Sequence, residues 1–215
     1  MPWTLIDAAT EGDALLELYT KDAVFMIRAN GLELMNGFCH ESEVALGQLA
    51  AEMAPAPTPR ILVGGLGLGY TTAALTQALG TAGTVTVAEF SQAVIDWFHR
   101  HVRPSVMPEM PGNLTIAHAD VAEALAEGRH DLIVLDVDNG PEALVTARND
   151  SLYALEGLQA VHRSLCAGGK VLLWSGFDSP EFAARAELAG FQVRCEPFKR
   201  GRPELAHYIY ILAKG

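Results

Sequence analysis

The residues best suited to chemistry are a glycine-rich loop and an acid that follows it. Residues 60–69 read Arg-Ile-Leu-Val-Gly-Gly-Leu-Gly-Leu-Gly, a short β-branched run that leads into glycines. Such glycines let the backbone turn sharply and approach a ligand closely. Glu89 ends the next apolar run, where its carboxylate can accept hydrogen bonds from both hydroxyls of a ribose. This succession of strand, glycine turn, helix and acid is typical of a nucleoside-binding βαβ unit.

Two more acids stand in equivalent places after the following apolar runs. Asp120 follows the third run, and Asp136 follows the fourth as the first residue of Asp-Val-Asp-Asn-Gly-Pro. Because the carboxyl ends of parallel strands meet at one edge of a sheet, we expect Glu89, Asp120 and Asp136 to lie near one another, and Phe90 belongs to the same site. We expect Asp120 to hydrogen-bond an adenine amino group or to cap the helix that follows it, and the two roles are compatible.

Asp136 is the candidate for the reacting end of the site, where it positions an acceptor or acts as a base. A structural hydrogen bond within the loop is the alternative. Asp138 and Asn139 are the other candidate catalytic residues. Asp138 can raise the pKa of Asp136 by like-charge proximity, whereas Asn139 is also a common turn residue. Trp174 and Tyr153 are expected either to line the ligand site or to pack in the core.

The spacing of the glycines indicates which nucleoside is bound. A phosphate-binding loop requires Gly-Lys-Ser/Thr, but Gly69 is followed by Tyr and Thr, which disfavours nucleoside triphosphates. A dinucleotide loop requires its third glycine three residues after the second, whereas Gly65, Gly67 and Gly69 alternate. An alternating turn suits an uncharged nucleoside with a short side arm, so we predict S-adenosylmethionine or its decarboxylated form as the cofactor. No His or Cys has partners at metal-ligand spacing, and no metal is predicted.

The elements that must position these residues alternate between strand and helix. Strand-like apolar runs occupy residues 61–63, 84–88, 114–118, 132–135, 170–174, 192–196 and 207–212. Helical patterns occupy residues 70–79, 91–101, 121–126, 152–165 and 180–188. This alternation predicts an α/β fold of the Rossmann-like type, with a doubly wound, mainly parallel sheet of seven strands. The last two runs are close in sequence, so we expect them to form an antiparallel hairpin at one edge.

The chain before residue 60 has a different pattern. Short β-like runs separated by turn residues predict a small antiparallel N-terminal sheet, with strands at residues 14–20, 23–29 and 32–35. A helix is expected over residues 42–53, and three alternating prolines follow it. We therefore predict three parts: a small β appendage (residues 1–40), a helix with a proline-rich linker (41–59) and a nucleoside-binding transferase domain (60–215).

Composition and charge exclude several classes of function. The 215 residues include 26 Asp and Glu against 15 Lys and Arg, a formal net charge of −11, which opposes binding to nucleic acid. No apolar run approaches the roughly 20 residues of a membrane helix, and the N-terminus lacks the basic and apolar segments of a secretory signal. The three scattered cysteines suit reduced thiols. We predict a cytoplasmic protein that binds neither nucleic acid nor membrane.

These motifs give the sequence a resemblance to a known family. The chain resembles the spermidine synthase (aminopropyltransferase) superfamily, within the adenosylmethionine-type transferases. The resemblance is carried by the glycine loop 64–69, Val-Ala-Glu-Phe at 87–90, His-Ala-Asp at 118–120, Asp-Leu-Ile-Val-Leu-Asp at 131–136 and the segment 34–43. It implies a Rossmann-like transferase core, a sulfonium donor, a small-molecule acceptor such as an amine, and a homodimer.

Two departures from the synthases bear on the reaction. The resemblance places Gly67 where the synthases carry an aspartate that faces the aminopropyl amine. It matches Asp136 to the first aspartate of their Asp-Ser-Ser-Asp-Pro motif, but Asn139 stands at the second. Losing carboxylates that face an amine favours methyl transfer to a small acceptor. Aminopropyl transfer to a polyamine is the first alternative, and a non-catalytic nucleoside-binding protein is the second.

Overall fold

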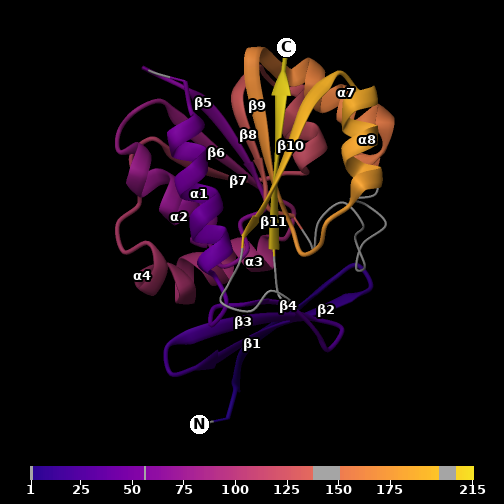
Figure 1. The fold of residues 1–215 in the computed structure, drawn as a ribbon. Coiled ribbons are helices and arrows are strands. Elements are labelled where there is room, and N and C mark those ends of the chain that lie inside the picture. The colour runs from indigo at the N-terminus through magenta and orange to yellow at the C-terminus, as the bar shows by residue number, and fades with distance from the viewer. Residues whose placement is uncertain (1, 56, 138–150, 199–206) are drawn as a thin grey trace.

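A computed structural model of the chain describes residues 2–55, 57–137, 151–198 and 207–215 (Figure 1). Two sheets organise the fold. The larger has seven strands in the order β10-β11-β9-β8-β5-β6-β7. Its strands are β5 (Arg60–Gly64), β6 (Thr84–Glu89), β7 (Leu114–His118), β8 (His130–Leu135), β9 (Leu165–Ser175), β10 (Phe191–Phe198) and β11 (His207–Lys214). Among the described helices, none is long and apolar enough to cross a membrane.

The seven-stranded sheet confirms the predicted doubly wound architecture. Strands β5 to β9 pair in parallel. Strand β11 runs antiparallel to both β9 and β10, so the last two strands form the expected hairpin at one edge. The strand order reverses between β5 and β8, which pair with each other although they are separated in sequence. In open α/β sheets, ligands bind outside the carboxyl ends of the strands at such a reversal.

Helices cover both faces of this sheet because successive strand side chains point to opposite sides. Ile61 and Val63 join a core cluster with the helices of one face, whereas Leu62 between them joins the cluster of the other face. The first face carries α1 (Glu41–Met53), α2 (Tyr70–Leu79) and α3 (Gln92–Trp97), and the second carries α5 (Val121–Ala126), α7 (Leu155–Ser164) and α8 (Pro180–Leu188) (Figure 1).

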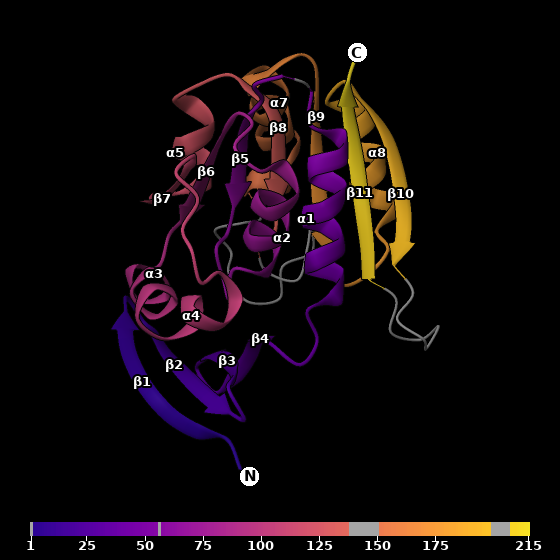
Figure 2. The same cartoon turned by 90° about the vertical axis from the view of Figure 1, so that its left-hand side faces the viewer.

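The smaller sheet is antiparallel and contains β1 (Thr4–Glu11), β2 (Ala14–Lys21), β3 (Val24–Ala29) and β4 (Leu32–Asn36). The sequence pattern did not predict β1, because this edge strand is mostly exposed and shows little apolar alternation. The sheet lies below the carboxyl ends of the parallel strands (Figure 2). The main chain of Ala93 in α3 donates to Glu11 at 2.9 Å, and Leu18 and Ile27 are buried with the first core cluster. The small sheet therefore covers the carboxyl edge of the large sheet, where the predicted site lies.

Two predicted helices differ from the structure. The helix expected over residues 91–101 divides into α3, a π-helical turn (Phe98–Val102) and α4 (Arg103–Val106). The N–H of Arg103 bonds to the carbonyl of Phe98, five residues back, as in a π turn. The helix expected over residues 152–165 was also misplaced at its end: Leu165 already begins β9, which is longer than predicted. The glycines at 168 and 169 hid this first part of the strand, because glycine weakens a strand pattern.

Candidate functional site

The glycine loop joins β5 to α2, and its three alternating glycines all have positive φ: 85° at Gly65, 52° at Gly67 and 81° at Gly69. A Cβ at Gly65 would overlap the carbonyl oxygen of Asp136, and one at Gly69 would overlap the ring of Phe98. The packing of the protein itself therefore requires these two glycines. At Gly67 a Cβ would meet the sulfur of Met35 at 2.8 Å, so a β4 side chain covers the loop at this position.

Glu89 at the end of β6 holds the loop in place. Its Oε2 accepts from the N–H of Leu66 at 2.9 Å and of Gly67 at 3.5 Å, and its Oε1 accepts from the N–H of Ser91 at 2.8 Å. Burial raises the pKa of Glu89, and these three N–H donors oppose that shift. The structure thus gives Glu89 a loop-fixing role that the sequence did not predict. The predicted hydrogen bonds to a ribose stay a prediction.

An open hollow of about 300 Å³ lies beside the carboxyl ends of β6 and β7, lined by Phe90, His118, Ala119, Asp120 and Glu123. Phe90 is 52% exposed beside this hollow. The ring of His118 is 6.5 Å from that of Phe90, and its Nε2 lies 2.8 Å from the Phe90 carbonyl oxygen. The hollow therefore brings together two predicted cofactor-binding residues, Phe90 and Asp120.

Asp120 is the N-cap of α5, as one of its two expected roles requires. Its Oδ1 accepts from the N–H of Ala122 at 2.8 Å. The same side chain lines the open hollow. The helix cap therefore uses Oδ1 of Asp120. A contact between Oδ2 and an adenine amino group stays a prediction.

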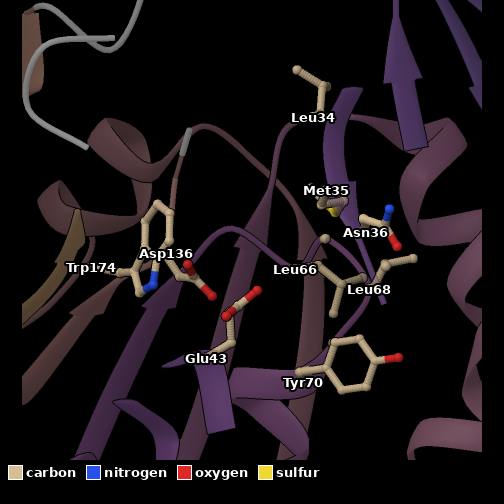
Figure 3. A pocket seen from close by; sticks show the side chains of 11 residues that line it. Leu34, Met35, Asn36, Glu43, Leu66, Leu68, Tyr70, Asp136 and Trp174 are labelled. Atoms are coloured by element: carbon tan, nitrogen blue, oxygen red, sulfur yellow. The ribbon is translucent and has the colours of Figure 1, made fainter. Parts of the chain in front are cut away.

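A second hollow, the reaction cavity, lies over the glycine loop (Figure 3). Its volume is about 100 Å³. It is lined by Leu34, Met35, Asn36, Glu43, Leu66, Gly67, Leu68, Gly69, Tyr70, Asp136 and Trp174. Trp174 thus lines the site, as one of its two expected placements requires. Its indole N–H is buried and has no hydrogen-bond partner among the described residues.

Asp136, directly after β8, is the most perturbed carboxyl group of the reaction cavity. The hydroxyl of Thr71 donates to its Oδ2 at 2.5 Å. Burial raises the pKa of Asp136 to about 7; the Thr71 hydrogen bond opposes this shift, and the charge of Glu43 adds to it. A carboxyl group with a pKa near neutrality can take up and release a proton under ordinary conditions, as a general base requires.

Glu43 of α1 is a residue of this cavity that the sequence did not assign to the site. Figure 3 shows its carboxyl group and that of Asp136 pointing toward one another. The hydroxyl of Ser42 donates to Oε2 of Glu43 at 2.5 Å, and His207 Nδ1 lies 2.7 Å from the same hydroxyl oxygen. The sequence signal for Glu43 was its place in the segment 34–43, which carried part of the family resemblance.

Tyr70, the first residue of α2, adds a phenol to the wall of the reaction cavity. Its ring stacks on His40 with centroids 4.0 Å apart and 14° between the planes. Burial, followed by the charge of Glu43, raises the pKa of Tyr70. The phenol is therefore neutral at physiological pH and can donate a hydrogen bond.

The remaining predicted residues have different outcomes. Asp138 and Asn139 lie outside the described residues. Tyr153 is 1% exposed, and its ring packs edge-on against Phe182 with centroids 5.9 Å apart, so it is a core residue and does not line the site. Across the described ranges, no three His, Cys, Asp or Glu side chains gather in a way that could hold a metal ion.

Comparison with known proteins identifies the fold. No family model matches the chain, and no curated protein matches it either. Solved structures do. Spermidine synthase from Thermotoga maritima has a TM-score of 0.74 and 17% identity over 98% of this chain and 73% of its own. A candidate spermidine synthase from Corynebacterium glutamicum ATCC 13032 has a TM-score of 0.67 and 17% identity over 97% and 79%. A methyltransferase candidate from Thermoplasma acidophilum has a TM-score of 0.54 and 16% identity over 74% and 69%.

These likenesses define the class of fold. The chain has a spermidine synthase-like fold with a methyltransferase-type core, as the sequence resemblance predicted. At this level of identity the likeness concerns the fold alone, because one fold hosts many functions. The function must therefore be argued from the residues of the site.

Proposed function

We propose that this protein is a transferase that uses an S-adenosylmethionine-type sulfonium donor and transfers a methyl group to a small acceptor, an amine being a candidate. The observation that carries the proposal is Asp136, a half-buried carboxyl group in the cavity wall whose pKa desolvation raises to about 7. It lines a cavity over a glycine loop that is tied down by Glu89. Perturbed carboxyl groups in a cleft are characteristic of sites that move protons.

The two hollows suit the two parts of such a donor. The open hollow of about 300 Å³ offers the Phe90 ring and the Asp120 carboxylate to an adenine. In this proposal the carboxylate of Glu89, which follows the glycine loop in the βαβ unit, accepts hydrogen bonds from a ribose as well as from the loop. The reaction cavity of about 100 Å³ is smaller than the roughly 300–1,000 Å³ of sites that enclose a whole ligand, so it suits the sulfonium end and the acceptor. Gly67 and Gly69 of the glycine loop line this cavity.

The proposed mechanism uses the protein for orientation and proton transfer. When bound, the sulfonium donor supplies an activated methyl group and a neutral thioether leaving group. The cavity walls hold the acceptor in line with the reacting carbon, which is the larger part of catalysis in such a displacement. Asp136 takes the proton that an amine acceptor loses as its new bond to carbon forms. Glu43 and Asp136 together favour positive charge in the cavity.

The first loop favours methyl transfer. At Gly67 no carboxylate faces the cavity, and the sulfur of Met35 covers the position instead. The side arm of S-adenosylmethionine carries a carboxylate beside its ammonium, whereas the aminopropyl ammonium of the decarboxylated donor has no such partner and would be costly to bury without a carboxylate from the protein. In this proposal Met35 replaces a charged contact by an apolar one.

Aminopropyl transfer is the alternative, and Glu43 is the observation that favours it. Glu43 gives the cavity a second carboxyl group beside Asp136, and no Lys or Arg is among the described residues that line it. Two carboxyl groups in the cavity lining suit positively charged amines on both the donor and the acceptor. A non-catalytic nucleoside-binding protein would gain nothing from a carboxyl group whose pKa lies near 7.

Calorimetry tests the proposal. The purified protein is titrated with S-adenosylmethionine, its decarboxylated form and methylthioadenosine, and mass spectrometry then identifies products formed with a panel of small amines. Binding of S-adenosylmethionine and a methylated product support the proposal. Preference for the decarboxylated donor and an aminopropylated product support the alternative. Binding of none of the three nucleosides contradicts both.

A further inference from the structure

A chain of three polar side chains leads out of the reaction cavity. Glu43 Oε2 accepts from the hydroxyl of Ser42 at 2.5 Å, and the hydroxyl oxygen lies 2.7 Å from Nδ1 of His207. Ser42 is 2% exposed, so its hydroxyl is enclosed between its two partners. His207 opens β11 and is only half-buried, and its ring packs edge-on against Trp174 at 4.8 Å.

These three hydrogen-bonded side chains come from distant parts of the sequence. Ser42 and His207 are 165 positions apart, and α1 meets the sheet at β9, next to β11. A buried serine does not need two charged or ionisable partners for stability, since one hydrogen bond satisfies its single proton. The arrangement links the cavity carboxylate to a ring that reaches the surface.

Such a link suits the reaction cavity. Asp136 is half-buried, and among the described residues the other carboxyl group that lines the cavity is Glu43. Once donor and acceptor fill the small cavity, they cover Asp136 from that side. A base that receives a proton in each turnover must release it before the next, and a route through the protein allows this release while the cavity is still occupied.

We propose that Glu43, Ser42 and His207 form this proton exit; the inference rests on the proposed function. As the acceptor nitrogen bonds to the donor carbon and the sulfur–carbon bond breaks, the nitrogen loses its proton to Asp136, and Asp136 passes it to Glu43. Protonated Glu43 donates to the Ser42 oxygen while the Ser42 hydroxyl donates its own proton to Nδ1 of neutral His207. Glu43 is again a carboxylate, and His207 is an imidazolium that releases a proton to water. Its tautomer then resets for the next cycle.

Ser42→Ala and His207→Phe are the test variants. The first removes the central hydroxyl, and the second keeps a ring against Trp174 but removes Nδ1. Ser164→Ala is the matched control, because Ser164 is also a buried serine but its hydroxyl donates at 2.8 Å to Val161 of its own helix. Product formation is measured at several buffer concentrations, and donor affinity is measured separately by calorimetry.

We expect both variants to lose roughly tenfold or more in turnover, within the range of proton-transfer contributions. Donor affinity should stay within about twofold of the parent protein, and added buffer should restore turnover because buffer acids and bases replace the missing route. Variants that turn over like Ser164→Ala at every buffer concentration would overturn the proton exit. Failure of the parent protein to bind any donor would instead contradict the proposed function.

A measurement without substrates completes the test. The ring-nitrogen NMR signals of His207, assigned with His207→Phe, are compared in the parent protein, Ser42→Ala, Glu43→Gln and Ser164→Ala. A connected chain predicts that the Nδ1 signal shifts in Ser42→Ala and Glu43→Gln but not in Ser164→Ala. An Nδ1 signal that is the same in all four proteins refutes the chain, whatever the enzyme assay shows.

Discussion

Replacing Asp136 by asparagine should make the protein more stable and less active. The carboxyl group has an ordinary pKa of 3.8, which burial raises to about 7 in the folded protein. A raised pKa means that the folded state favours the protonated acid. The stability that this gives is fully present below pH 3.8 and is lost as the pH rises through about 7. Above that window the folded protein bears the cost of a buried charge.

The size of this cost follows from the shift. A difference of about 3 pKa units, at about 1.36 kcal/mol each, corresponds to about 4 kcal/mol. The asparagine side chain cannot ionise, and its carbonyl oxygen can still accept from the Thr71 hydroxyl. The Asp136→Asn variant should therefore exceed the parent protein in free energy of unfolding by about 4 kcal/mol at about pH 8, and by less than about 1 kcal/mol at about pH 4.

Urea unfolding over this pH range measures the difference. Asp13→Asn is the control, because it removes the same charge from an exposed turn between β1 and β2. Turnover of Asp136→Asn should fall by about 100-fold or more, as expected for the loss of a general base. The parent protein's turnover should rise with pH through about 7. A constant stability difference between Asp136→Asn and the parent protein at all pH values would refute the reasoning.

Three further predictions concern the donor side of the site. Glu89→Ala should weaken donor binding roughly tenfold or more in calorimetry, because charge-assisted hydrogen bonds are lost, whereas Asn139→Ala should weaken it less. Asp120→Ala should lower the free energy of unfolding by about 1 kcal/mol through loss of the helix cap; Asp120→Ser keeps the cap but should still lose donor affinity. Met35→Ala combined with Gly67→Asp should increase affinity for the decarboxylated donor roughly tenfold, because an acid then faces its amine.

Each of these has an outcome that contradicts it. If Glu89→Ala and Asn139→Ala lost donor affinity equally, the assignment of the ribose to Glu89 would be wrong. Full donor affinity in Asp120→Ser would reduce Asp120 to a helix cap. An unchanged preference between the two donors in the Met35→Ala, Gly67→Asp protein would show that the loop acid does not decide the transferred group.

The fold around the glycine loop was largely predictable from the sequence because its signals are local. Strand, glycine loop, helix and acid follow one another without interruption from residue 60 to Glu89, and the helix over 70–79 was predicted with its observed ends. The seven strands were also found, since parallel strands buried on both faces read as continuous apolar runs. What a local pattern could not give was the packing reason for Gly65 and Gly69, whose neighbours are Asp136 and Phe98.

The acceptor side was not predictable in the same way because it is assembled from distant segments. Met35 comes from β4, Glu43 from α1 and Trp174 from β9. Ser42 and His207 meet across 165 positions. No spacing rule connects these residues. The sequence named Asp136, Gly67 and Gly69 as site residues and left Trp174 open between the site and the core; all four line this cavity. Tyr153 was left open in the same way, and it packs in the core.

This division between local and assembled parts bears on the choice between methyl and aminopropyl transfer. In the proposed function, the nucleoside would be bound by the βαβ unit, which is compatible with either reaction. The transferred group would be decided by the N-terminal sheet and α1, whose residues lie over Gly67 and opposite Asp136. A change of reaction in this fold therefore does not require a new core. It requires different side chains in the sheet and helix that cover the loop, and here Met35 lies against Gly67, the position at which the family resemblance implies an aspartate in the synthases. The two positions should be judged together, because a Cβ at residue 67 would displace the flexible end of Met35.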